Sequence, residues 1–452
     1  MNINTIRTVC FLGIGGIGMS ALARFFKAQG CAVSGYDKTP TPLTQKLIQE
    51  GIAVHFAEDI SQIPKGIDLV VYTPAVPTTH AEYQYFLSHS IPIKKRAEIL
   101  GMIASRYFSV AVAGTHGKTT ITGLISHILF SSNIPVTAFI GGILKNYRSN
   151  LILSENAKVV VAEADEFDRS FLNLNPDMAV ISAIDADHLD IYSDKKNLEN
   201  SYHLFAGQIK QGGSLIYKCS LEMPELPGIK KYSYGLNDKA DFYAKNIFLK
   251  DARFHFTACL LGTKIPVEIM TPGRHNIENA VAAAAVCHLY GLNPEQIKQG
   301  IETYEGVCRR FDIRIDKKSL VYIDDYAHHP EELKAFINAV KEMYPDKKIT
   351  GIFQPHLFSR TRDFADDFAS VLDKLDEAIL LDIYPARETP IEGITSKLLL
   401  DKMTISNKRI LTVSQLLDEL KQNRKEVLLT MGAGDIDQLI EPIETILNGI
   451  YT

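Results

Sequence analysis

The sequence predicts an α/β protein made of several domains. At 452 residues the chain is too long for a single hydrophobic core, and its length predicts two to four domains. Short apolar runs rich in β-branched residues alternate with stretches whose apolar positions recur every three or four residues, the pattern of strands followed by helices. Two glycine-rich loops each join such a strand to such a helix, an arrangement typical of nucleotide-binding α/β folds.

The composition is that of an ordinary soluble globular protein, with 46% hydrophobic and 22% charged residues. A formal net charge of -5 gives no basic field for nucleic acid or an anionic membrane, so we expect neither as a partner. Six scattered cysteines without a Cys-x-x-Cys pair predict reduced thiols, and the first residues carry no signal-peptide pattern. We expect a cytoplasmic protein that acts on small molecules as a monomer or a weak homodimer.

The first glycine loop follows a short buried strand at residues 9–12. A second strand at residues 32–33 leads to Asp37, about 20 residues after the loop, where an acidic side chain would meet a ribose hydroxyl. Taken alone, this pattern predicts NAD. The same geometry holds any diphosphate against a helix N-terminus, so we favour a nucleotide-diphosphate substrate and keep a purely structural turn as an alternative. The loop glycines are Gly13, Gly15, Gly16 and Gly18.

The first domain extends to about residue 106. Residues 68–72 form another predicted strand, and the domain closes with the polar segment at residues 94–98. Arg96 in this segment is a candidate phosphate contact. On sequence alone, we favour a solvated helix start as the interpretation of these charges.

The second glycine loop joins an apolar run at residues 110–113 to a helix with one apolar face. In that geometry the backbone N–H groups form an anion site, Lys118 reaches the β- and γ-phosphates, and the Thr119 hydroxyl ligates Mg²⁺. The generic P-loop has a glycine where Val112 stands, so this is a tighter form of the motif. ATP is the expected ligand, and an ordinary turn with a capping threonine is the alternative. The loop residues are Gly114, Thr115, His116, Gly117, Lys118, Thr119 and Thr120.

Acidic segments follow the next two predicted strands, at residues 159–162 and 178–184. They span residues 163–168 and 185–190. Carboxyl ends of parallel strands face the same crevice as the glycine loop, where a magnesium nucleotide needs ligands. Solvated loops are the alternative interpretation of each acidic segment.

Residues 213–271 switch to short alternating strands, which predicts a β-rich insertion packed on the second domain. An alanine-rich helix then runs to about Tyr290. Asn276 and Asn279 share a face of its first turn. Helix capping explains Asn276, and two amides on one face also suit a purine; the sequence leaves both interpretations open.

A third α/β domain is predicted from residue 312 to residue 452. Its strands, at residues 320–323, 349–353, 378–383 and 427–430, end in polar segments. These segments predict a second binding crevice at the carboxyl ends of the strands, although a histidine pair before proline is often only a turn.

Eight segments, in this order, resemble the motifs of the Mur ligase family. They are residues 114–120, 163–166, 187–190, 272–279, 309–311, 324–330, 353–356 and 431–434. The resemblance covers all three predicted domains, at residues 1–106, 107–311 and 312–452. It implies a Rossmann-like domain that binds a UDP-sugar, a central P-loop ATPase domain with the β-rich insertion, and a Rossmann-like C-terminal domain that binds an amino acid.

The resemblance also implies a reaction, in which L-alanine is joined to the carboxylate of UDP-N-acetylmuramate through an acyl phosphate, with ATP and Mg²⁺, during peptidoglycan precursor synthesis. The residues suit this chemistry because a carboxylate is inert to amines until phosphorylation makes a leaving group. A recycling ligase of the same family, which adds a tripeptide to the same sugar, is the alternative. The second phosphate loop argues against an NAD-dependent dehydrogenase, since hydride transfer needs no γ-phosphate site.

The family's site residues can be carried over position by position. The implied catalytic residues are Lys118, His188, Arg310, Asp325, His328, His356 and Arg360. The implied Mg²⁺ ligands are Thr119, Glu163 and His188. Adenine is assigned to Asn276 and Asn279, and the nucleotide phosphates and ribose to Arg310 and Asp325. The UDP end is assigned to Asp37, Arg96 and the first-loop glycines. L-alanine and the acyl group are assigned to Tyr326, His328, His356 and Arg360.

One position departs from the family pattern. The motif at residues 353–356 commonly continues with arginine, and here the next residue is Leu357. The departure leaves open which cation, apart from Arg360, pairs with the amino-acid carboxylate.

Overall fold

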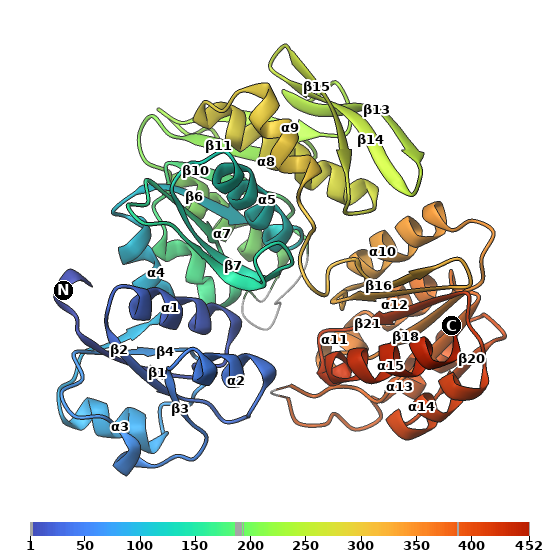
Figure 1. The fold of residues 1–452 in the computed structure, drawn as a ribbon, viewed down its shortest axis with the longest axis horizontal. Coiled ribbons are helices and arrows are strands. Elements are labelled where there is room, and N and C mark those ends of the chain that lie inside the picture. Colours follow the sequence, from blue (N-terminus) through green and yellow to red (C-terminus); the bar gives the residue numbers. More distant parts are fainter. Residues whose placement is uncertain (1–2, 186–191, 193, 387, 452) are drawn as a thin grey trace. The chain divides into compact units, whose positions relative to one another are not determined.

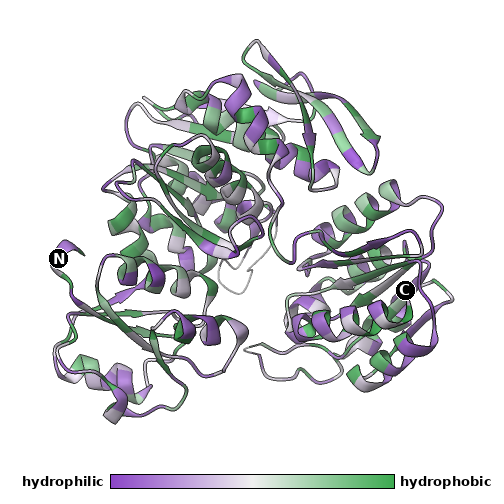
Figure 2. Ribbon diagram, in the orientation of Figure 1, coloured by the Kyte–Doolittle hydropathy of each residue, from purple (hydrophilic) through white to green (hydrophobic). Residues whose placement is uncertain are grey.

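The computed structural model describes residues 3–185, 192, 194–386 and 388–451, and in these residues three sheets organise the chain (Figure 1). The chain divides into two compact units near Glu305. The first unit holds the two N-terminal sheets. The second holds the third sheet together with residues 248–254 and 270–276. Hydrophobic residues concentrate on the inner strands of the sheets, while the covering helices mix both kinds (Figure 2).

The first sheet is parallel and has the order β3-β2-β1-β4-β5. Strand order reverses at β1, the position where α/β sheets bind ligands beyond their carboxyl ends. The strands are β1 (Thr8–Leu12), β2 (Ala32–Tyr36), β3 (Ala53–His55), β4 (Leu69–Tyr72) and β5 (Ile93–Lys95). The helices are η1 (Ile3–Thr5), α1 (Ile17–Ala28), α2 (Pro42–Gln49), η2 (Ile60–Gln62), α3 (Ala81–Ser88) and α4 (Arg96–Ala104).

The central sheet has the order β15-β14-β13-β12-β11-β10-β6-β9-β7-β8. Strand β6 (Phe108–Ala113) pairs in parallel with β9 (Val159–Glu163) on one side and β10 (Met178–Ile181) on the other. The carboxyl ends of these three strands therefore meet at one edge. Strands β7 (Val136–Leu144) and β8 (Ser149–Leu153) complete that side. The helices are α5 (Lys118–Ser131), η3 (Phe167–Asn173), α7 (Lys195–Gly207), α8 (Arg274–Tyr290) and α9 (Pro294–Glu302).

The β-rich segment belongs to the central domain, as expected, and it does so by continuing the central sheet. Strand β11 pairs in parallel with β10, β12 with β11, and β13 with β12. Each added strand satisfies the backbone groups that an edge strand would leave unpaired. The strands are β11 (Ser214–Lys218), β12 (Lys230–Gly235), β13 (Phe242–Lys250), β14 (Arg253–Leu260) and β15 (Thr263–Ile269).

The third sheet has the order β16-β17-β21-β18-β19-β20, with only β16 antiparallel to its neighbour. Asp325 and Phe353 both pair with Met431, so the polar segments after β17, β18 and β21 lie side by side. The strands are β16 (Asp312–Lys317), β17 (Leu320–Asp325), β18 (Ile349–Phe353), β19 (Glu377–Leu380), β20 (Lys408–Ile410) and β21 (Val427–Met431). The helices are α10 (Pro330–Met343), α11 (Phe358–Asp363), α12 (Ala365–Leu372), α13 (Ser396–Lys402), α14 (Val413–Gln422), η4 (Asp435–Leu439) and α15 (Ile440–Ile450).

Among the residues that the structure describes, no helix is both long enough and apolar enough to cross a lipid bilayer.

An ion network lies in the third sheet around Glu377, the first residue of β19. Its carboxylate accepts hydrogen bonds from Arg409 Nη2 at 2.6 Å and from Lys425 Nζ at 2.7 Å, and a third from Thr350. Burial acts to raise the pKa of Glu377, but these hydrogen bonds outweigh it and lower the pKa to about 2. The network thus holds Glu377 ionised in the folded protein.

We predict that Glu377→Gln lowers the free energy of unfolding by on the order of 3 kcal/mol at pH 7. Because the folded pKa lies below the unfolded value, this contribution is present above about pH 4.5 and is lost as pH falls toward 2. The difference between wild type and variant should therefore shrink in acid. Urea denaturation measures this difference. Unfolding is followed by circular dichroism because the chain has no tryptophan to serve as a fluorescent probe. Asp366→Asn, which removes an exposed partner of Lys402, is the control and should have a much smaller effect. An equal loss at pH 7 and pH 3 would contradict the role of the network.

Candidate active site

The second glycine loop connects β6 directly to α5, and two of its glycines are required for both conformation and space. Gly114 has φ +135° and Gly117 has φ +81°, values that favour glycine. A Cβ at position 114 would lie 2.1 Å from Ser182 Oγ, and one at position 117 would lie 2.7 Å from Asn279 Oδ1. The loop is therefore packed tightly against the end of β10 and the start of α8.

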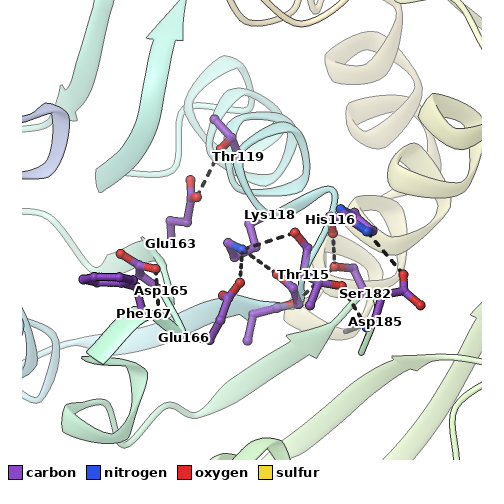
Figure 3. Close-up of polar contacts among 12 residues, drawn as sticks. Thr115, His116, Lys118, Thr119, Glu163, Asp165, Glu166, Phe167, Ser182 and Asp185 are labelled. Atoms are coloured by element: carbon purple, nitrogen blue, oxygen red, sulfur yellow. Dashed lines mark hydrogen bonds and ion pairs between the residues drawn. The ribbon is translucent and has the colours of Figure 1, made fainter. Parts of the chain in front are cut away.

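Lys118, the first residue of α5, is held by the loop and by a buried carboxylate (Figure 3). Its Nζ donates to Gly114 O at 2.6 Å and pairs with Glu166 Oε1 at 2.9 Å. Burial lowers the pKa of Lys118, but Glu166, Glu163 and Asp165 outweigh this and raise it. Burial also raises the pKa of Glu166, whose exposed fraction is 1%. The lysine is thus held protonated by the acidic end of β9.

Thr119 and Glu163 lie together beside the loop. Thr119 Oγ1 donates to Glu163 Oε1 at 3.1 Å (Figure 3). Glu163 Oε2 accepts a hydrogen bond from Gly141 N at 2.9 Å. Oxygen donors of this kind suit Mg²⁺, which uses one or two protein ligands together with substrate phosphates and water. His188, the third expected ligand, lies outside the described residues. Within those residues, no three His, Cys, Asp or Glu side chains gather as a metal cluster.

Residues that directly follow β10 contact the other side of the second glycine loop. Ser182 Oγ donates to His116 O and to Ala113 O, the latter at 3.2 Å. Thr115 Oγ1 accepts from Asp185 N at 3.1 Å, and His116 Nε2 lies 3.3 Å from Asp185 Oδ2 (Figure 3). The sequence prediction missed Ser182, although its place at the end of a strand next to an acidic segment was a usable signal. Thr120 is buried in the first turn of α5.

The two asparagines of α8 are placed differently. Asn279 Oδ1 faces Gly117, which puts this amide beside the second glycine loop. Asn276 lies inside the first turn, since the helix begins at Arg274, and its Nδ2 donates to Pro272 O at 2.6 Å. Asn276 is therefore not the capping residue of the helix.

The first glycine loop is closed by Asp37, which follows β2. Gly15 N donates to Asp37 Oδ2 at 2.7 Å, and a Cβ at position 15 would lie 2.7 Å from Thr44 Cγ2. Gly13 has φ +86°, and Gly16 caps α1 without a side-chain hydrogen bond. A Cβ on Gly18 would lie 2.6 Å from Arg96 Nη1. The structure thus brings all six residues assigned to the UDP-sugar together.

In the second unit, Asp325 ends β17 with a buried carboxylate. It accepts hydrogen bonds from Phe311 N at 2.6 Å and Ala327 N at 2.7 Å. Burial raises the pKa of Asp325 to about 7 against the opposing charge of Arg310. The Arg310 guanidinium lies 5.1 Å from the centre of the Tyr326 ring. Arg310, Asp325 and Tyr326 therefore form one group.

Two histidines that follow different strands, β17 and β18, meet beside this group. The ring centres of His328 and His356 are 5.8 Å apart, and the His328 ring is 5.2 Å from that of Tyr326. His328 Nδ1 lies 3.2 Å from Glu332 Oε2, and the His356 ring stacks on Tyr384 at 5.7 Å. Sequence reasoning missed Glu332, which lies within α10, and Tyr384, which directly follows the predicted strand at residues 378–383 but belongs to none of the eight motif segments.

Arg360 and Leu357 lie at the start of α11. Arg360 is buried, with an exposed fraction of 7%, and its charge acts to lower the pKa of Tyr326, which burial raises overall. Leu357 precedes the helix with φ +70°, a strained value for a branched side chain. The arginine expected at position 357 is therefore replaced by an apolar residue in a strained turn, and Arg360 is a buried cation one turn away.

Comparison with known proteins identifies the family of this chain. Family models match residues 8–108 (Mur ligase family, catalytic domain), 112–287 (Mur ligase middle domain) and 309–434 (Mur ligase, glutamate ligase domain). The UDP-N-acetylmuramate–L-alanine ligase of Parabacteroides distasonis is 49% identical over 455 residues, covering 99% of this chain and 98% of its own. The chain belongs to the Mur ligase family. Its three sheets correspond to the N-terminal, middle and C-terminal parts of the Mur ligase architecture.

Solved Mur ligase structures share this fold over their whole length. UDP-N-acetylmuramate-alanine ligase from Thermotoga maritima has a TM-score of 0.82 at 26% identity, covering 98% of this chain and 99% of its own. A murein peptide ligase from Psychrobacter arcticus has a TM-score of 0.73 at 21% identity, with coverages of 99% and 100%. The second similarity shows the Mur ligase fold alone.

We predict that Lys118→Met lowers the rate of phosphate release by more than the roughly 10²- to 10³-fold typical of losing one electrostatic contact, because the lysine also positions the nucleotide. It should also destabilise the fold by about 3 to 5 kcal/mol, since Glu166 keeps no cation. The double variant Lys118→Met/Glu166→Gln should regain most of the stability and none of the rate. Thermal unfolding and a phosphate-release assay check both effects. Near wild-type phosphate release by a folded Lys118→Met variant would falsify the assignment of the loop.

Proposed function

We propose that this Mur ligase joins L-alanine to the carboxylate of UDP-N-acetylmuramate, with ATP converted to ADP and phosphate. The observation that carries the proposal is 49% identity, over nearly the whole chain, to a protein named UDP-N-acetylmuramate–L-alanine ligase. The ATP loop with its protonated lysine supplies what such a reaction needs. We place the reaction in the cytoplasm, and the six cysteines, which form no disulfide in the structure, suit a reducing compartment.

The first unit supplies the phosphoryl-transfer chemistry in this proposal. Lys118 and the N–H groups at the start of α5 would stabilise negative charge on the transferring phosphoryl group. Thr119 and Glu163, with His188 as the expected third ligand, would hold Mg²⁺. When bound, this ion offsets the charge of the nucleotide phosphates. Asn279 would contact adenine from its place beside Gly117, and we retain Asn276 as its proposed partner.

The second unit supplies the groups proposed for the amino acid. Tyr326, His328 and His356 form one cluster, and Arg360 offers a buried guanidinium that would pair with the α-carboxylate of L-alanine. Arg310 and Asp325 are proposed to contact the nucleotide phosphates and ribose. With Leu357 apolar, Arg360 is the cation that we assign to the carboxylate.

A substrate panel tests the proposal. Purified protein is given ATP, Mg²⁺ and UDP-N-acetylmuramate together with each amino acid in turn, or with the tripeptide L-alanyl-γ-D-glutamyl-meso-diaminopimelate, and phosphate release is measured. We expect L-alanine to support the fastest turnover. Turnover with the tripeptide alone would instead assign the chain to the recycling activity.

We predict that Gly15→Val weakens binding of UDP-N-acetylmuramate while ATP still binds. A side chain at this position collides with Thr44 and Asp37 and so displaces the loop N–H groups. Gly207→Ala is the matched control, because a Cβ there meets nothing within 4 Å. Calorimetric titrations with UDP-N-acetylmuramate and with NADH decide the ligand. Tight NADH binding without sugar binding would reverse the assignment of this loop.

We predict that Arg360→Ala raises the KM for L-alanine by about 10- to 100-fold, the effect of losing a hydrogen bond between charged groups. The KM values for ATP and the UDP-sugar should change little, and acyl phosphate should still form. Arg362→Ala is the control from the same helix, since Arg362 is half exposed and pairs with Asp363. If the KM for L-alanine is unchanged and only ATP or the UDP-sugar is affected, Arg360 does not bind the amino acid.

A further inference from the structure

Arg96 joins the two glycine loops of the first unit. It is the first residue of α4, and its Nη1 would lie 2.6 Å from a Cβ on Gly18, so the guanidinium rests on the first turn of α1. From the same guanidinium, Nη2 donates to Asp165 Oδ2 at 3.1 Å. The side chain is 23% exposed. One cation therefore contacts both the diphosphate loop and the acidic segment after β9.

Asp165 connects this contact to the ATP loop. Its neighbour Glu166 forms the ion pair with Lys118, and Glu163, two residues earlier, receives the Thr119 hydroxyl. The backbone holds Asp165 in place, because its Oδ1 accepts from Phe167 N at 3.1 Å and its carbonyl accepts from Phe171 N at 2.8 Å. Asp165 therefore belongs to the same short acidic segment whose other carboxylates contact Lys118 and Thr119.

The two proposed substrates bring several negative charges into this small region. A diphosphate on the first loop and a triphosphate on the second repel each other through partly desolvated protein, where the Coulomb energy is larger than in water. A guanidinium has five N–H donors in a planar fork and can serve a carboxylate and a phosphate at once. Arg96 stands where such a shared cation would act.

We propose that Arg96 is a shared counterion that allows the UDP-sugar and ATP to bind together, which makes it a positioning residue that couples the two sites. This inference rests on the proposed function. The coupling is the ratio of the nucleotide dissociation constants measured with and without saturating UDP-sugar. Removing a cation between two anions can only make that coupling less favourable.

The test is calorimetric titration of a non-hydrolysable ATP analogue with Mg²⁺, with and without saturating UDP-N-acetylmuramate. In wild type we expect similar affinities in both conditions. In Arg96→Met the analogue should bind on the order of tenfold more weakly when the UDP-sugar is present than when it is absent. Arg96→Lys keeps the charge, so the ratio of the two dissociation constants should return toward the wild-type value. A purely structural role of Arg96 would not explain this return.

Lys95→Met provides the matched control. Lys95 precedes Arg96 and pairs with Asp168 at 2.7 Å, so it carries a similar ion pair to the same acidic segment. This variant should leave the ratio as in wild type. An unchanged ratio in Arg96→Met, or an equal change in Lys95→Met, overturns the inference. Failure of wild type to bind UDP-N-acetylmuramate would overturn the proposed function instead.

Discussion

The ion pair between Lys118 and Glu166 is the constraint on which the nucleotide site depends. A charge buried without a partner costs several kcal/mol, so the first residue of α5 and the acidic segment after β9 must stay close together. Parallel pairing of β6 with β9 meets this requirement, since it brings the carboxyl ends of both strands to one edge. The neighbouring contact of Thr119 with Glu163 follows from the same pairing.

Both glycine loops engage carboxylates of the protein with groups suited to phosphate. Asp37 accepts the Gly15 N–H in the first loop, and Glu166 receives Lys118 in the second. An incoming phosphate must therefore compete with an anion that is already well placed. The affinity for a phosphate then depends on the difference between its own contacts with the loop and those of the carboxylate that it displaces. This difference favours ligands whose phosphates make several contacts at once. In the proposed function, this competition selects against smaller anions.

Sequence patterns predicted the elements and residues whose signals are local. The glycine loops, Asp37 and the acidic end of β9 lie where a strand meets a turn, and short-range rules describe such junctions well. The β-rich segment was predicted as strands, but its continuation of the central sheet was not, because strands that extend a sheet carry the same alternation as strands that form another layer. Capping remained open for Asn276 until the helix start was known to be Arg274.

Contacts between segments that are far apart in the sequence could not be predicted from the sequence. Arg96 and Asp165 are 69 residues apart, and only the packing of α4 against the segment after β9 brings them together. The strained backbone of Leu357 could not be predicted either. The sequence shows that leucine replaces the arginine common in the motif, but it gives no backbone angle. The domain boundaries and the site roles stay predictions, and His188 lies outside the described residues.

The inner position of β6 has a consequence for how the molecule opens. Its backbone is hydrogen-bonded on both edges, and its residues from Val110 to Ala113 are at most 2% exposed. Sheets fray from their margins, so β6 belongs to the segment whose amide hydrogens exchange with solvent most slowly. The second glycine loop is thus tethered at its amino end to an inner strand. Fluctuations that loosen the edge strand β15 can proceed without disturbing this loop.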